Sequence, residues 1–217
     1  MPITFGTDGW RGIIGEDYTV HNVRLCAQGV VDLMKDRGLA SRGLVVGYDT
    51  RFLSDKFATA AAEVAVANGV KTVLSDRPVP TPVLSYNLVF RGAGGGIVIT
   101  ASHNSAEWNG FKFKPEYGGS ASPELVNELE KHIAMAEESG CVSEDTVYAA
   151  SEKGLFDYFN PESAYIKHLP SLVDLEGIQR AGLTVVADAM HGAGGGFFTK
   201  LIAGGRTEII EIRRDPN

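Results

Sequence analysis

Apolar positions along the chain alternate between helical spacing and the short continuous runs that are typical of buried strands. The first helical stretch extends from Val20 to Met34, with Thr19 in the place of its N-cap and Gly38 in the place of its stop. Residues 44–47 are almost continuously apolar and predict a buried strand directly after that helix. The regular alternation predicts an α/β fold in which helices sandwich a mixed, mostly parallel sheet.

The same alternation continues as far as a helix that starts near residue 122. Ser122 is its predicted N-cap, Pro123 its first residue and Glu124 an acid in its first turn. Ser54 is the predicted cap of an earlier helix, which Gly69 ends. The sequence further predicts buried strands at 70–74 and 97–100, a short helix at 83–90 and a half-exposed strand at 111–114.

The periodic pattern is lost from residue 140 to about residue 152, which predicts a linker. We therefore expect a first domain at residues 1–150, followed at residues 151–217 by a partial second α/β unit. Two strands alone cannot cover both faces of a sheet, so this second unit is predicted to be incomplete. Its predicted elements are a helix from Asn160, a buried strand at 183–187, a glycine-rich turn at 191–196, a helix at 197–203 and a strand at 207–212.

Composition and charge narrow the class of protein. The 217 residues are 44% hydrophobic and 22% charged, as in a soluble globular protein. The formal net charge of −7 argues against nucleic-acid binding, but not against one small phosphorylated ligand. The two cysteines, Cys26 and Cys141, give no disulfide framework and no zinc spacing, and Cys26 is expected to be a buried free thiol. Without a secretion signal or a membrane-length apolar run, we expect a cytoplasmic protein with no membrane partner.

The strongest chemical signal follows the predicted strand at 97–100, where Ser102, His103 and Asn104 stand side by side. Chemistry in α/β folds collects at the carboxyl ends of strands, and a serine there can carry a group that is being transferred. A phosphorylated Ser102 would hold about −1.5 to −2 charges and would need nearby cations or a metal. The candidate cations are Lys112, Lys114 and Arg11.

A Ser-His-Asp hydrolase is the competing interpretation of the same residues. On an extended backbone, Ser102 and His103 would point to opposite faces. The nucleophile elbow Gly-x-Ser-x-Gly is also absent. The structural alternatives are a serine that bonds to its own turn and a histidine that serves packing. The nearby cations favour a serine that holds phosphate.

Three further loops offer weaker signals. The segment Phe5–Gly12 alternates glycines and presents amides and an arginine to an anion, although an ordinary N-terminal loop would look the same. Asp49 and Arg51 are expected to form a local salt bridge that shapes the loop after the strand at 44–47. The turn at 191–196 is expected to be an ordinary glycine turn, with Asp188 at the strand end before it as a candidate cap.

Taken together, these motifs resemble those of the α-D-phosphohexomutases, which include phosphoglucomutase, phosphomannomutase and phosphoglucosamine mutase. The string Thr-Ala-Ser-His-Asn at 100–104, followed by Asn-Gly-Phe-Lys at 109–112, is highly specific. The segments at 5–12 and 47–51 match in kind and in order. The resemblance continues to residues 188–196 and so covers most of the chain.

The resemblance implies a mechanism. Ser102 would be carried as a phosphoserine, pass its phosphoryl group to a hexose phosphate, and regain the other phosphoryl group from the bisphosphorylated sugar. The catalytic residues implied are Ser102, His103, Lys112 and Arg11, with Lys112 and His103 as candidates for proton transfer. Arg11, Asn104 and Lys112 are the implied phosphate-binding residues. Magnesium would bind Ser102 through its phosphate, a glucose-1,6-bisphosphate-type molecule would be the activator, and glucose or mannose 1- and 6-phosphates the substrates.

The chain departs from the family pattern in two places. The family's aspartate-rich metal loop, Asp-Gly-Asp-x-Asp-Arg, does not occur in the 217 residues, and Ser105 stands where a proline is usual. The family has four domains, so we expect the remaining metal ligands beyond Asn217 and the rest of the same polypeptide, domains II to IV, as the partner of this chain. The chain alone is expected to be an inactive N-terminal portion. Phosphoglucosamine mutase is the alternative within the family, and a non-catalytic phosphosugar-binding module is the alternative of another class.

Overall fold

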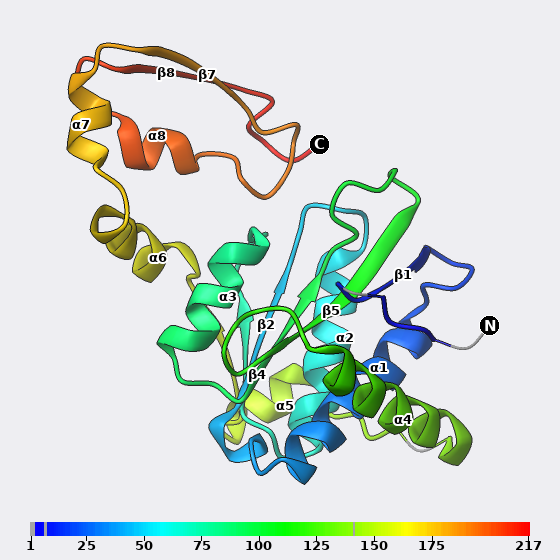
Figure 1. Cartoon of the computed structure of the whole chain (residues 1–217). Coiled ribbons are helices and arrows are strands. Elements are labelled where there is room, and N and C mark those ends of the chain that lie inside the picture. The colour runs from blue at the N-terminus through cyan, green and yellow to red at the C-terminus, as the bar shows by residue number, and fades with distance from the viewer. Residues whose placement is uncertain (1–2, 7, 141) are drawn as a thin grey trace.

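A computed structural model describes residues 3–6, 8–140 and 142–217, so Cys141 lies outside the described residues. Its main sheet has six strands in the order β1-β5-β4-β2-β3-β6 (Figure 1). Strands β2, β3, β4 and β6 are parallel, whereas β5 pairs antiparallel with both β4 and β1. The predicted mixed, mostly parallel sheet between helices is confirmed. The strands are β1 (Trp10–Ile13), β2 (Leu44–Tyr48), β3 (Thr72–Ser75), β4 (Gly95–Ile99), β5 (Trp108–Pro115) and β6 (Phe156–Phe159).

Helices cover the two faces of this sheet with separate cores. On one face, α1 (Val20–Asp36) packs between α2 (Ser54–Ala67) and α4 (Pro123–Ser139), and α5 (Val147–Glu152) packs against α2. On the other face, α3 (Thr81–Phe90) lies over β2 and β4 and contacts α6 (Glu162–His168). Two short 3-10 helices, Ala40–Arg42 and Leu169–Ser171, complete the connections.

The longest helices begin where their sequence signals predict. The Thr19 hydroxyl accepts the first-turn amide of Asn22, and the Ser122 hydroxyl accepts that of Leu125. Ser54 behaves differently, because the residue before it, Leu53, precedes α2 in a left-handed conformation without a side-chain cap. The Ser54 hydroxyl instead donates to the Asp49 carboxylate at 2.8 Å. The predicted Ser54 cap is therefore wrong, and this hydroxyl ties α2 to the loop after β2.

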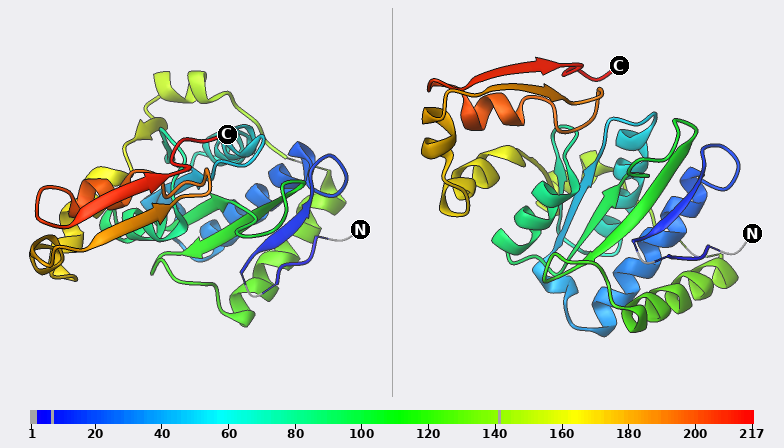
Figure 2. Two further views of the ribbon diagram at one scale, coloured as in Figure 1. Left: turned by 90° about the horizontal axis from the view of Figure 1, so that it is seen from above. Right: turned by 45° about the horizontal axis from the view of Figure 1, so that its top comes forward.

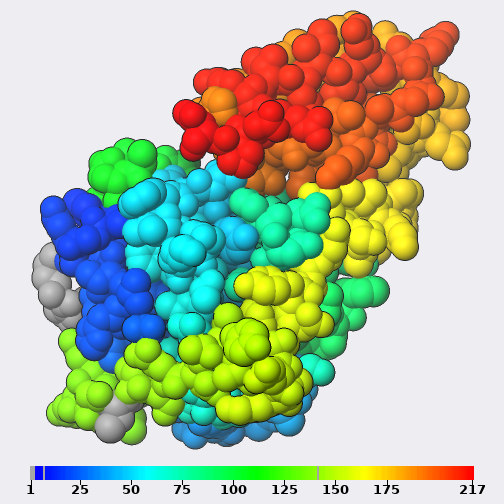
Figure 3. All heavy atoms as spheres, turned by 180° about the vertical axis from the view of Figure 1, so that it is seen from behind, coloured from blue at the N-terminus to red at the C-terminus, as the bar shows by residue number. Residues whose placement is uncertain are grey.

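A smaller unit, which we call the β7–β8 unit (residues 175–217), stands beside the main sheet (Figures 2 and 3). It contains α7 (Leu175–Arg180), β7 (Thr184–Asp188), α8 (Phe197–Ile202) and β8 (Glu208–Ile212). The two strands pair in parallel, as in a βαβ unit. The prediction that β7 is buried is wrong: Val186 is 60% exposed and its partner Ile210 is 41% exposed. In the part of the chain that the structure describes, helices cover only one face of this strand pair. Residues along β7 and β8 therefore alternate between exposed and half-buried.

Other differences come from pairing between distant segments. The predicted linker at 140–152 contains α5, and β6 adds a strand to the main sheet as far as Phe159. The strand predicted as half-exposed at 111–114 is buried, because β5 lies between β1 and β4. The segment Phe5–Gly12, which was predicted to be a loop, contributes its last residues to β1. The domain boundary at residue 150 stays a prediction.

Within the described residues, no helix is both long and apolar enough to span a membrane.

Candidate functional site

A cavity of about 650 Å³ lies at the carboxyl ends of the parallel strands, between the main sheet and the β7–β8 unit. The loop after β2 contributes Asp49 to Arg51, and the loop after β4 contributes Ser102 to Asn104. The glycine-rich turn after β7 closes the opposite side with residues 189–194. Ligands of open α/β sheets bind at such strand ends, so this cavity is the candidate site.

Ser102 has an unusual backbone conformation at the mouth of this site. Its φ of 58° is left-handed, which is uncommon for a residue other than glycine. Its amide donates to the Thr100 hydroxyl at 2.9 Å, and its Oγ lies 3.3 Å from Nδ1 of His103. The prediction that neighbouring side chains diverge here is wrong, because it assumed an extended backbone. No carboxylate among the described residues is hydrogen-bonded to His103, so a complete Ser-His-Asp arrangement is not formed.

Arg51 binds the backbone of the serine loop, residues 102–108, through hydrogen bonds. Its guanidinium donates to the carbonyls of Ser102 at 3.0 Å, Asn104 at 2.5 Å, Ser105 at 2.8 Å and Trp108 at 3.0 Å. The expected salt bridge to Asp49 is also present, at 3.4 Å. The planar fork of arginine suits several acceptors at once, which a lysine could not serve in the same geometry. Arg51 therefore fixes the backbone that presents Ser102, a role that sequence reasoning assigned only to its own loop.

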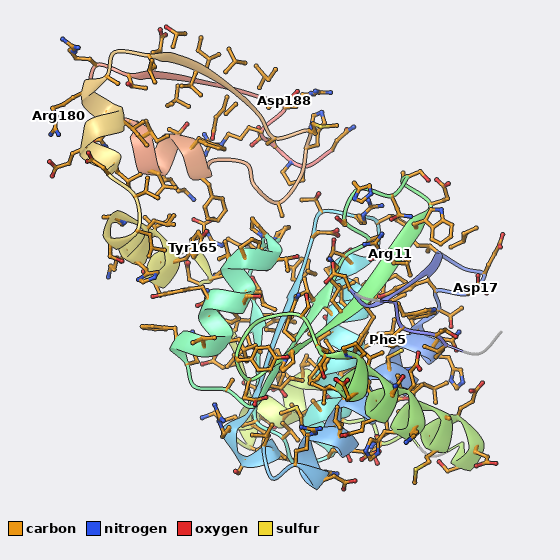
Figure 4. All side chains as sticks on the ribbon, viewed as in Figure 1. Phe5, Arg11, Asp17, Tyr165, Arg180 and Asp188 are labelled. Atoms are coloured by element: carbon orange, nitrogen blue, oxygen red, sulfur yellow. The ribbon has the colours of Figure 1, made fainter. Side chains whose placement is uncertain are left out.

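Arg11 reaches the same loop from β1. Pairing of Arg11 with Gly110 of β5 places the arginine beside the serine loop, where its Nη1 donates to Asn104 Oδ1 at 2.7 Å. Figure 4 labels Arg11 on the main sheet and Asp188 at the end of β7. The structure thus brings Arg11, Asn104 and Ser102 together, although Arg11 itself lies outside the lining of the cavity.

Lys112 lies on β5 and bonds elsewhere. It forms an ion pair with Asp8, and the ammonium of Lys114 lies 3.5 Å from the same carboxylate. Both lysine side chains are 7% exposed. Burial raises the pKa of the Asp8 carboxyl, but hydrogen bonds and charge from Lys112 and Lys114 outweigh it and hold that pKa below its ordinary value. Two buried ammonium groups share one carboxylate, so the cluster keeps a net positive charge next to β4.

The turn after β7 carries strain of the same kind as Ser102. Met190 and His191 have φ values of 48° and 60°, and both line the cavity. Non-glycine residues in this region gather at functional sites, because surrounding structure must hold them there. Asp188 accepts the Met190 amide at 2.9 Å and pairs with Arg213, which lowers the pKa of Asp188. The sequence predicted an ordinary glycine turn. Its left-handed Met190 and His191 and its position opposite Ser102 distinguish it, and no sequence signal indicated either feature.

Comparison with known proteins agrees with this arrangement. Residues 2–140 match the model of the family described as phosphoglucomutase/phosphomannomutase, alpha/beta/alpha domain I. The chain belongs to the α-D-phosphohexomutase family. A phosphoglucomutase of Staphylococcus saprophyticus is 31% identical over 195 residues, 88% of this chain and 35% of its own length. A phosphoglucosamine mutase of Corynebacterium diphtheriae is 32% identical over 222 residues, 100% of this chain and 47% of its own length.

Solved structures of phosphohexomutases have the same fold. The crystal structure of a putative phosphomannomutase from Thermus thermophilus has a TM-score of 0.85 and 32% identity. The match covers 100% of this chain and 47% of that one. This phosphohexomutase chain therefore spans half or less of the length of the relatives it matches.

The described residues do not form a metal site by themselves. No group of three or more histidine, cysteine, aspartate or glutamate side chains that could hold a metal ion occurs in residues 3–6, 8–140 and 142–217. Magnesium prefers several oxygen ligands in near-octahedral geometry. The magnesium expected from the family therefore stays a prediction, and we derive no chemical step through it.

Proposed function

We propose that Ser102 carries a phosphoryl group in an intramolecular phosphotransferase that interconverts hexose 1-phosphate and hexose 6-phosphate. The observation that carries the proposal is the left-handed Ser102, held by its loop carbonyls on Arg51 and open to the cavity. A nucleophile fixed in this way can meet a substrate without reorganising, which lowers the entropic part of the barrier. The β7–β8 unit bounds the opposite side of the cavity and would help to exclude water.

The proposed step exchanges one phosphate ester for another. The bond between Ser102 Oγ and phosphorus breaks while a bond forms between phosphorus and a hydroxyl oxygen of the sugar phosphate. The sugar hydroxyl loses its proton and Ser102 Oγ gains one. His103 Nδ1, 3.3 Å from that oxygen, is the nearest candidate to return the proton. The bisphosphorylated sugar then gives its other phosphoryl group back to Ser102, which completes the isomerisation.

Positive charge near the loop supports the same proposal. Arg11 reaches the loop through Asn104, and Lys112 and Lys114 share the single carboxylate of Asp8. We propose that Arg11 stabilises a phosphoserine dianion at the loop, and that Lys112 and Lys114, which lie outside the lining of the cavity, add positive charge at longer range. In the family pattern Arg11, Asn104 and Lys112 bind phosphate, and we propose the same roles here. Magnesium on the phosphoserine and a glucose-1,6-bisphosphate-type activator belong to the proposal as well.

Intact-mass analysis tests the phosphoserine directly. We expect the full-length protein treated with glucose 1,6-bisphosphate and magnesium to gain one phosphate, and its Ser102→Ala variant to gain none. Ser105→Ala, which removes a hydroxyl three residues away on the same loop, is the matched control and should be phosphorylated normally. Phosphate on another residue, or no phosphate on the full-length protein, would contradict the proposal and favour a non-catalytic phosphosugar-binding module.

The identity of the sugar and the activity of the chain alone are also proposals. We propose glucose or mannose phosphates as substrates, with glucosamine phosphate as the alternative, since relatives named for glucose and for glucosamine are similarly close. We propose that the chain alone does not turn over. Appreciable conversion of glucose 1-phosphate by the 217-residue chain, with magnesium and activator present, would contradict this.

A further inference from the structure

A second cavity lies at the opposite end of the main sheet from Ser102. It has a volume of about 190 Å³ and opens where β2, β3 and β4 begin. Strand β2 connects the two places, because Leu44 at its start lines this cavity and Asp49 after its end lines the candidate site. The proposed phosphotransfer makes no use of this end of the sheet.

The cavity gathers positive charge in a chain that is negative overall. Arg42, Lys71 and Arg91 line it, and no carboxylate is among its described lining residues. None of the three forms an ion pair with any residue that the structure describes, although acids outnumber bases in the chain by 27 to 20. Three like charges around one hollow repel one another, and a bound anion would relieve that repulsion.

Packing against an aromatic ring orients the Arg91 guanidinium in a way that suits anion binding. Its guanidinium lies over the Phe159 ring, 4.4 Å from the ring centre. Stacking uses the flat face of the guanidinium and leaves its N–H donors in the plane, where a phosphate or carboxylate binds them. Burial lowers the pKa of Arg91, although the nearby Asp157 opposes this effect. Arg91 as a whole is exposed, so an anion can reach the edge of its guanidinium from solvent.

The other walls add two more cationic side chains, Arg42 and Lys71, and an apolar floor. Arg42 uses Nε to bind the carbonyl of Gly92 at 2.9 Å, which fixes its side chain while its terminal nitrogens stay available. Lys71 is exposed, and no hydrogen bond to its ammonium group is found in the described part of the chain. The floor consists of the buried Leu44, Val45 and Ala93 with the half-buried Val73.

We propose that this cavity binds the phosphate group of a small phosphate monoester between Arg42, Lys71 and Arg91, with an apolar part of the ligand against the floor. A dianion matches three converging cations better than a singly charged group does. The site is separate from the Ser102 cavity, so it would make the protein responsive to a phosphorylated molecule other than its substrate. The inference does not depend on phosphotransfer at Ser102.

Titration followed by amide NMR tests the site on the whole 217-residue chain. Inorganic phosphate and phenyl phosphate are added separately at constant ionic strength, with sodium chloride as the reference salt. We expect saturable shifts at amides 41–45, 71–73 and 91–93, distinct from any at 100–104 and 189–194. Tighter binding of phenyl phosphate than of inorganic phosphate would support a monoester with an apolar part, and equal binding of the two would contradict that part of the proposal. Absence of saturable shifts at the first three segments would overturn the proposal.

Variants separate a specific site from general attraction to positive charge. Lys71→Met should weaken phosphate binding by about fivefold, as expected for one exposed charge. Arg91→Lys keeps the charge but loses the fork, and should also weaken binding. Lys131→Met removes an exposed lysine from α4, outside the cavity, and is the matched control. Equal affinities in Lys71→Met, Arg91→Lys and the control would refute a built site, provided that circular dichroism shows all three folded.

Discussion

Single side chains decide whether the serine loop keeps its shape, and Arg51 makes the clearest case. Its guanidinium serves four carbonyls between Ser102 and Trp108, and only a planar group with several N–H donors can do so. We expect Arg51→Lys to leave the global fold intact and to increase amide exchange at residues 102–105 by roughly tenfold or more, since one or two charge-assisted hydrogen bonds are lost. Hydrogen exchange followed by NMR measures this.

Arg37→Lys is the matched control for that experiment. The Arg37 guanidinium donates two hydrogen bonds, both to the Glu128 carboxylate at the surface between α1 and α4. We expect no change at residues 102–105 in this variant. Phosphorylation of Ser102 should fall in Arg51→Lys and stay normal in Arg37→Lys. If loop exchange were the same in both variants, Arg51 would have no special part in presenting the serine.

Asp8 is expected to affect stability in a pH-dependent way. Its pKa is lower in the folded chain than in the unfolded chain, so its contribution is present above the unfolded pKa and is lost as pH falls through the folded pKa. We expect Asp8→Asn to lower the free energy of unfolding at pH 7 by about 1–2 kcal/mol, since solvent reaching Asp8 screens a pair that is otherwise buried. The difference from the unchanged chain should shrink below about pH 4.

Urea unfolding at several pH values checks this, with Asp55→Asn as control. Asp55 lies on the surface of α2 and its neighbour Lys56 is 3.7 Å away, so its removal should change stability at pH 7 by less than about 0.5 kcal/mol. A difference between Asp8→Asn and the unchanged chain that stayed constant from pH 7 to pH 3 would contradict the electrostatic explanation.

At the scale of helices, the contact between α1 and α4 depends on a missing side chain. A Cβ added to Gly29 would lie 2.5 Å from Ile133 Cγ1 and 3.0 Å from the Ile133 backbone nitrogen. Alanine normally improves a helix over glycine by about 1 kcal/mol, but here the two helices would have to separate. We expect Gly29→Ala to lower the free energy of unfolding by about 1–3 kcal/mol. In Gly194→Ala, where the added carbon meets nothing within 4 Å, stability should hardly change. A more stable Gly29→Ala would contradict this packing.

Elements with local signals could be predicted, and elements made by distant pairing could not. Helices α1 and α4 carry their caps, Thr19 and Ser122, within the segment itself. Strands β1 and β6 are short, and their partners β5 and β3 lie far along the chain, so no local pattern reveals them. The serine loop was found from its residue types, whereas the carbonyl contacts of Arg51 depend on a backbone conformation that the sequence does not specify.

At the scale of the whole molecule, the shape of the candidate site depends on how the β7–β8 unit packs against the main sheet. Phe197 of α8 is buried in the same core as residues of α3 and β4, and its ring meets that of Tyr165 edge-on at 6.3 Å. Lys200 and Glu162 add an ion pair across the same junction. Residues 189–194, which face Ser102, are attached to this unit. The packing of Phe197 in this core therefore helps to set the width of the cavity.

Replacing Phe197 should loosen the unit without unfolding the main sheet. We expect Phe197→Ala to cost about 3 kcal/mol or more in the local stability of residues 175–217, because a large buried ring is lost. Its neighbour Phe198 is 51% exposed, so Phe198→Ala changes the same residue type on the same helix and should cost little. Hydrogen exchange should quicken throughout β7, β8 and the turn at 189–194 in Phe197→Ala alone, while the strands β2 and β4 stay protected. Equal exchange in the two variants would mean that the unit is held by its ion pairs rather than by this ring.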